Sequence, residues 1–146
     1  MIAAAMIPPA FRLLIGVLAA AGLPLAAYFT GVAYRWIPAD APWIPRVCQL
    51  KEESCRRIVD TPRARVFGVP NSLLGMGWYL ALAGLAAAGG APPGLAAACE
   101  VVAWGTVALG AFLTWSLLRE IRVRCVLCFA AHALNLGIAL VLARAL

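Results

Sequence analysis

Four long runs of apolar residues divide the chain, and short polar or proline-rich stretches separate them. The runs extend over about 13–34, 72–88, 94–118 and 125–143. Because a helix rises about 1.5 Å per residue, runs of this length suit a hydrocarbon core of roughly 30 Å. The pattern predicts an all-α membrane protein in which four transmembrane helices form a bundle.

The composition agrees with a protein that lives in the bilayer. Hydrophobic residues make up 64% of the chain and charged residues only 12%, well outside the averages of soluble domains. The first apolar run is too long for a signal peptide and has no compact basic region before it. We therefore expect residues 1–146 to be one multi-pass domain of the cell membrane.

The number of crossings brings most of the cysteines to one face of the membrane. With four spans, the link at about 35–69 and the link at 119–124 must lie on the same side. Four of the five cysteines belong to these links or follow them directly: Cys48, Cys55, Cys125 and Cys128. Cys99 falls near the opposite face, where we expect it to be a packing residue.

The first link has the composition of a cap that lies along the membrane surface. Its Trp36 and Trp43 suit the headgroup layer, where tryptophan is enriched. A short helix is expected at about 50–59, ending before Thr61-Pro62, and it would turn Cys55 toward the interior of the bundle. The link is thus predicted to be a cysteine-bearing capping loop.

Polar residues form one stripe at the start of the fourth span. Cys125, Cys128, His132 and Asn135 are separated by three, four and three residues, so they share a helical face. Polar groups within a membrane span are costly and usually functional. The stripe is predicted to line a pocket, with Asn135 deeper and suited to a hydrogen bond between helices.

Two thiols at a helix start favour disulfide exchange, although other interpretations exist. The helix N-terminus and the neighbouring Arg122 and Arg124 favour the thiolate. A CxxC pair can also be two buried apolar cysteines or half of a zinc site. Zinc is disfavoured because six residues separate Cys48 from Cys55. His132 could equally be a packing residue bonded to a neighbour.

Taken together, these pieces resemble the vitamin K epoxide reductase family of membrane thiol oxidoreductases. The resemblance covers nearly the whole chain. It rests on four features in a fixed order: the pair Cys48 and Cys55, the run Ser54-Cys55 through Thr61-Pro62 to Phe67-Gly68, the Pro70-Asn71 start of the second span, and Cys125-Val-Leu-Cys128.

The resemblance implies a fold and a set of roles. Family members fold as a four-helix bundle around a quinone of the menaquinone or ubiquinone type. Cys48 would exchange with a partner, Cys55 would shuttle electrons to Cys125, and Cys128 would lie next to the quinone. Quinone contacts are implied for four further residues: Asn71, His132, Thr61 and Phe67.

The implied activity is quinone-dependent disulfide formation. Electrons would pass from a partner dithiol through Cys48 and Cys55 to Cys125 and Cys128, and then to quinone. No thioredoxin-like domain follows the fourth span, so a separate thioredoxin-like partner is expected. His132 stands where vitamin K reducing members often have tyrosine, which weighs against an epoxide substrate.

Two other functions are compatible with the same residues. The first is a thiol-driven reductase of quinone or quinone epoxide, and the second is a non-catalytic scaffold with structural disulfides. A nucleic-acid role is disfavoured despite the net charge of +6, because the basic residues lie against the membrane without a binding module.

Basic residues predict the orientation. Of the 12 Lys and Arg residues, only Arg12 and Arg144 fall at the face opposite the cysteines. Basic residues in short loops favour the cytoplasmic side. The cysteine face is therefore expected in the cytoplasm. An exoplasmic site remains the alternative, in which the basic loop docks an acidic redox partner.

Overall fold

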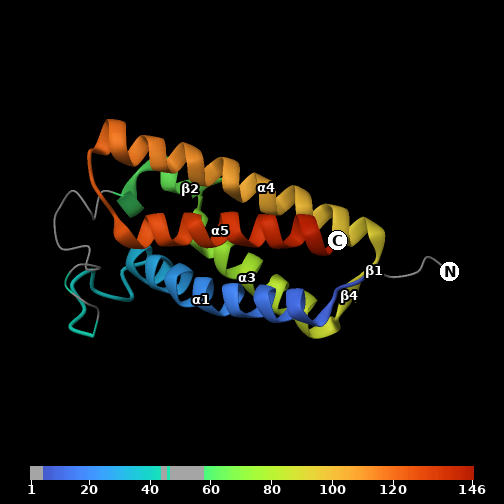
Figure 1. Ribbon diagram of the computed structural model, residues 1–146. Helices are drawn as coiled ribbons and strands as arrows, with labels where there is room; N and C mark the ends of the chain where they lie inside the picture. Colours follow the sequence, from blue (N-terminus) through green and yellow to red (C-terminus); the bar gives the residue numbers. More distant parts are fainter. Residues whose placement is uncertain (1–4, 44–45, 47–57) are drawn as a thin grey trace.

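The computed structural model describes residues 5–43, 46 and 58–146 (Figure 1). Its main elements are α1 (Pro9–Ala33), α3 (Asn71–Ala88), α4 (Pro93–Ser116) and α5 (Val126–Ala145). A π-helical turn, η3 (Leu117–Ile121), prolongs α4. All four helices are long and apolar enough to cross a membrane, which confirms the four predicted spans.

Local sequence accounts for the boundaries of the helices. Pro9 and Pro93 occupy the first turns of α1 and α4, where a missing backbone N–H costs nothing. Gly89 ends α3 in the left-handed conformation with φ 79°, which suits glycine best. A turn is therefore present between α3 and α4.

The helices pack in the order α3, α1, α5, α4. Helix α1 lies against both α3 and α5, and α4 packs on α5. The main core consists of buried side chains from all four helices, among them Ile15, Leu82, Ala103, Ile138 and Leu142. Small residues such as Ala103 let the helix axes approach each other where lipid offers no hydrophobic driving force.

At the end where α1 begins and α5 ends, short strands close the bundle. Strand β1 (Ala5–Met6) pairs antiparallel with β4 (Gly90–Ala91) in the turn between α3 and α4 (Figure 1). The Arg12 guanidinium donates hydrogen bonds to the carbonyls of Ala86 (2.9 Å) and Ala87 (3.3 Å). A cation there satisfies unpaired carbonyls at the helix C-terminus.

At the opposite end, parts of the first link cover the bundle. Ala39, Ala41 and Val59 are buried in a second cluster together with residues of α1 and with Cys125 and Cys128. Residues 58–60 are helical, which agrees with the end of the helix predicted at about 50–59, and the rest of that helix lies outside the described residues. The described parts of the link thus form a cap.

A short hairpin leads from the cap into α3. A 3₁₀ turn, η2 (Pro62–Ala64), is followed by β2 (Arg65–Val66), which pairs with β3 (Val69–Pro70). Phe67 and Gly68 form the two-residue turn, and both have positive φ, 52° and 81°. Positive φ at both central residues is typical of a type I′ hairpin turn.

Candidate functional site

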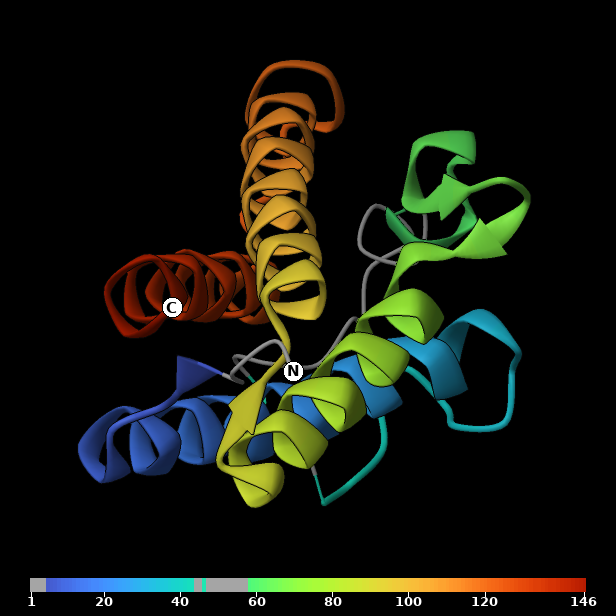
Figure 2. The ribbon, with the colours of Figure 1, turned by 90° about the vertical axis from the view of Figure 1, so that its right-hand side faces the viewer.

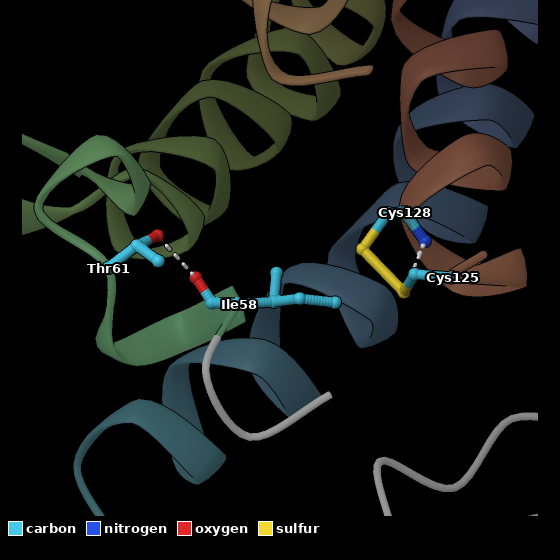
Figure 3. The surroundings of a disulfide bond; sticks show 4 residues. All are labelled: Ile58, Thr61, Cys125 and Cys128. Carbon is cyan, nitrogen blue, oxygen red and sulfur yellow. Dashed lines mark hydrogen bonds between the residues drawn. A yellow bond between two sulfur atoms is a disulfide. The ribbon is translucent and has the colours of Figure 1, made fainter. Parts of the chain in front are cut away.

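The two cysteines of the CxxC motif are joined by a disulfide at the start of α5 (Figure 3). Cys125 caps the helix, since its Sγ accepts a hydrogen bond from the backbone N–H of Cys128 at 3.3 Å. Both cysteines are buried, with 4% and 8% of their surfaces exposed. The side chain of Ile58 from the cap is directed toward them and packs on the same cluster.

A pocket adjoins the disulfide inside the bundle. Its empty volume is about 890 Å³, including the part open to the outside. Cys128 lies in its wall and Cys125 does not, although both cysteines belong to the buried cluster under the cap. The stripe predicted on the fourth span therefore lines a pocket through Cys128, His132 and Asn135.

Helix α3 supplies the facing wall. Asn71, the first residue of this helix, lines the pocket together with Gly75 and Tyr79. These three positions are spaced by four residues, so they lie on one helical face. Tyr79 was not predicted from the sequence, although this spacing from Asn71 could have indicated it.

A hydrogen bond crosses the pocket between α3 and α5. The Tyr79 hydroxyl donates to Asn135 Oδ1 at 3.0 Å. The prediction that Asn135 makes a hydrogen bond between helices is therefore confirmed. Gly22 of α1 makes room for the Tyr79 ring, because a Cβ at Gly22 would overlap that ring. The bond leaves the amide N–H groups of Asn135 available at this depth of the pocket.

His132 contributes a nitrogen that nothing in the described chain satisfies. Its Nε2 is buried and has no hydrogen-bond partner among the described residues. On the other edge of the ring, Nδ1 lies against Gly110 of α4, where an added Cβ would come within 2.8 Å. The absence of a side chain at Gly110 therefore accommodates the imidazole between α4 and α5.

Thr61 and Phe67, predicted as quinone contacts, occupy different environments. Thr61 lines the pocket, and its hydroxyl donates to the Ile58 carbonyl at 2.9 Å (Figure 3). Phe67 is fully exposed and does not line the pocket, contrary to the sequence prediction. The reason is local, since the tight turn at Phe67-Gly68 projects the ring away from the bundle.

Three further cysteines are present in the chain. Cys48 and Cys55 lie outside the described residues. Cys99 is a free thiol in α4 that is partly buried and packs against the main core, as expected of a packing residue.

Comparison with protein families decides the identity of this arrangement. The sequence profile described as the vitamin K epoxide reductase family matches residues 13–143, nearly the whole chain. The chain belongs to the vitamin K epoxide reductase family. No individual curated protein matches the sequence. As a family member, it is an oxidoreductase of the membrane, and the family's thiol chemistry is linked to quinone.

The pocket of this family member suits a quinone head group. Most of its lining is apolar, as in pockets that bind flat hydrophobic ligands. Among the polar side chains that line it, the Asn71 amide and the His132 imidazole can donate hydrogen bonds to carbonyl oxygens. The buried Nε2 without a partner is the observation that favours a ligand there.

Proposed function

We propose that the protein makes disulfides, taking electrons from the dithiol of a separate thioredoxin-like protein and passing them to quinone in the pocket. The observation that carries the proposal is the position of the Cys125–Cys128 disulfide between two environments. Both cysteines belong to the cluster under the cap, and Cys128 in addition belongs to the pocket wall. A redox pair so placed can connect thiols on one side with an acceptor on the other.

The first step is thiol exchange at the cap. Cys48 and Cys55 receive two electrons from the partner, whose two thiols become a disulfide. The Cys55 thiolate then attacks Cys125 Sγ, which forms a mixed disulfide and releases Cys128 as the thiolate. Attack at Cys125 is supported by the cap, whose residues Ala39, Ala41 and Val59 are buried in the same cluster as this cysteine. Cys48 then resolves the mixed disulfide, restoring its bond with Cys55.

The released Cys128 thiolate forms at the first turn of α5, where the helix N-terminus stabilises negative charge. A quinone, when bound, accepts two electrons and two protons and so allows the Cys125–Cys128 disulfide to form again. Asn71 and His132 hold the head group by its carbonyl oxygens. His132 can also deliver a proton through Nε2. Thr61 stabilises the local turn of the cap through its bond to the Ile58 carbonyl.

The test is anaerobic reduction of decylubiquinone by the purified protein, with a small dithiol or a reduced thioredoxin as donor. Wild type should reduce the quinone with either donor, and Cys128→Ala with neither. Cys48→Ala should fail with thioredoxin and keep activity with the small dithiol. Cys99→Ala, which removes a packing thiol outside the pocket, is the matched control. Equal activity in Cys128→Ala and wild type would refute the proposal.

We also propose that the cysteine face is cytoplasmic. Arg12 and Arg144 are the two cations predicted at the other face. The Arg12 guanidinium is hydrogen-bonded to a helix carbonyl, and the Arg144 side chain is exposed. The test uses a cysteine-free variant with one new thiol at an exposed position. Asp40→Cys places this thiol on the cysteine face, and Gly94→Cys places it on the opposite face. An impermeant maleimide on intact cells should label Gly94→Cys alone. Labelling of Asp40→Cys alone would place the site outside.

A further inference from the structure

The bundle is not closed evenly around the pocket. Among the described helices, α1 packs with α3 and α5, and α4 packs with α5, but α3 and α4 have no extensive contact. Figure 2 shows that the end of α3 and the start of α4 lie close together at the turn that joins them, and that the two helices diverge away from this turn. The pocket is lined by residues of both helices, among them Asn71 and Tyr79 of α3 and Leu113 and Ser116 of α4.

The segment from η2 to β3 occupies the wide end of the gap. Figure 2 shows this segment beside the start of α3, and Figure 1 shows it next to the end of α4. It continues directly into α3, because Pro70 of β3 precedes Asn71. Its attachment to α3 is therefore covalent, whereas its attachment to α4 depends on side chains.

Arg63 of η2 makes that attachment. Its guanidinium forms an ion pair with Glu120 of η3 and donates a hydrogen bond to Ser116 Oγ at 3.0 Å. Ser116, only 2% exposed, in turn donates to Glu120 Oε2 at 3.4 Å. The guanidinium also lies 5.9 Å from the centre of the Phe112 ring. One side chain thus contacts three residues near the end of α4.

The π-helical turn helps to form this cluster. A π-turn widens the helix by one residue and is frequent at functional sites. It begins directly after Ser116 and contains Glu120, whose carboxylate lies beside Ser116. Both Arg63 and Ser116 also line the pocket. The ion pair therefore borders the space in which the quinone is proposed to bind.

We propose that the Arg63–Glu120 pair is a latch on the lateral opening of the pocket, and that its release admits quinone from the bilayer between α3 and α4. The proposal rests on the function proposed above, since it takes the pocket to be the quinone site. Arg63 is a positioning residue in this role. It holds the η2–β3 segment across the gap and takes no part in electron transfer.

A latch has a kinetic consequence that a binding contact does not have. If the head group passes only when the pair is broken, association and dissociation both scale with the open fraction. Weakening the pair raises both rates together and leaves Kd unchanged. A residue that merely contacts bound quinone would change the dissociation rate and Kd instead.

The experiment follows quenching of tryptophan fluorescence when decylubiquinone is mixed with, or displaced from, the purified full-length protein. Because partly exposed ion pairs contribute modestly, Arg63→Gln should raise both rates about three- to fivefold, with Kd within twofold of wild type. Glu120→Gln tests the pair from the other side. The double charge exchange Arg63→Glu with Glu120→Arg should restore slow rates.

Arg65→Gln is the matched control, because Arg65 lies on the same η2–β3 segment and, among the described residues, donates to the Gly68 carbonyl of its own turn (3.2 Å) and not to α4. It should leave both rates at the wild-type values. The latch is wrong if Arg63→Gln and Glu120→Gln keep wild-type rates, if only dissociation accelerates, or if wild type binds no quinone. Binding with a gated rate but no reduction would instead refute the proposed function alone.

Discussion

Replacing Gly110 by alanine should disturb the pocket through a single contact. A Cβ at this position would lie 2.8 Å from Nδ1 and 3.2 Å from Cγ of His132. The first distance is shorter than real Cβ contacts, so the imidazole or one of the two helices has to move. We expect the ring to tilt away from α4, which changes where its Nε2 is directed.

The magnitude follows from two opposing effects. Overpacking a well-filled interior costs about 1–3 kcal/mol. Alanine in place of glycine within a helix contributes about 0.5–1 kcal/mol of stability. The net effect of Gly110→Ala is then a loss of about 0.5–2 kcal/mol. Quinone reduction should fall by about tenfold or more, because misplacing a positioned group by a fraction of an ångström is costly.

Gly105→Ala is the matched control on the same helix. A Cβ there would meet no atom within 4 Å, so only the helix propensity changes and stability should rise slightly. Thermal unfolding in detergent and decylubiquinone reduction measure the two effects. Adding His132→Ala to Gly110→Ala removes the ring and should recover stability.

The reasoning fails if Gly110→Ala and Gly105→Ala behave alike in both assays. It also fails if the double variant with His132→Ala is no more stable than Gly110→Ala alone. Either outcome would mean that the imidazole does not pack against α4 as described.

Two further predictions concern polar contacts in the bundle. Tyr79→Phe removes the hydroxyl that donates to Asn135 Oδ1. Hydrogen bonds between membrane helices contribute on average about 0.6 kcal/mol, and at most about 1.7 kcal/mol, to the free energy of unfolding. The variant should unfold at lower temperature by a corresponding amount. Arg12→Gln loses the bonds to Ala86 and Ala87 at the end of α3, which should cost about 1–2 kcal/mol in thermal unfolding without changing quinone reduction.

Each of these variants has a control that changes the same group elsewhere. Tyr34→Phe removes a hydroxyl from an exposed ring that stacks on Trp36, and it should leave stability unchanged. Arg144→Gln removes an exposed cation from the same face as Arg12. If Tyr79→Phe or Arg12→Gln is as stable as its control, the corresponding hydrogen bond contributes nothing measurable.

The stripe on the fourth span shows how far periodicity alone can go. Spacings of three and four residues placed Cys128, His132 and Asn135 on one face, and these residues do line the pocket. The same argument could have reached Tyr79 from Asn71 on α3. It was missed because a tyrosine in an apolar span gives no signal of its own until a second polar residue is known to face it.

Phe67 shows where local sequence misleads. Its motif Phe67-Gly68 resembles the family pattern, but the backbone at this position makes a tight turn with positive φ at both residues. Such a turn points the side chain outward, and the ring is fully exposed. A motif fixes the order of residues along the chain and does not by itself decide the direction in which a side chain points.

The sequence by itself determined what must lie in the membrane and which groups gather at one end of it, because hydrophobic length and the number of crossings depend on no partner. Only the tertiary structure decided which faces oppose each other. The contact of Arg63 with Ser116 joins residues 53 positions apart, and that of Tyr79 with Asn135 joins residues 56 apart. Such pairs form only when packed helices bring the two side chains together, and no local periodicity encodes that packing.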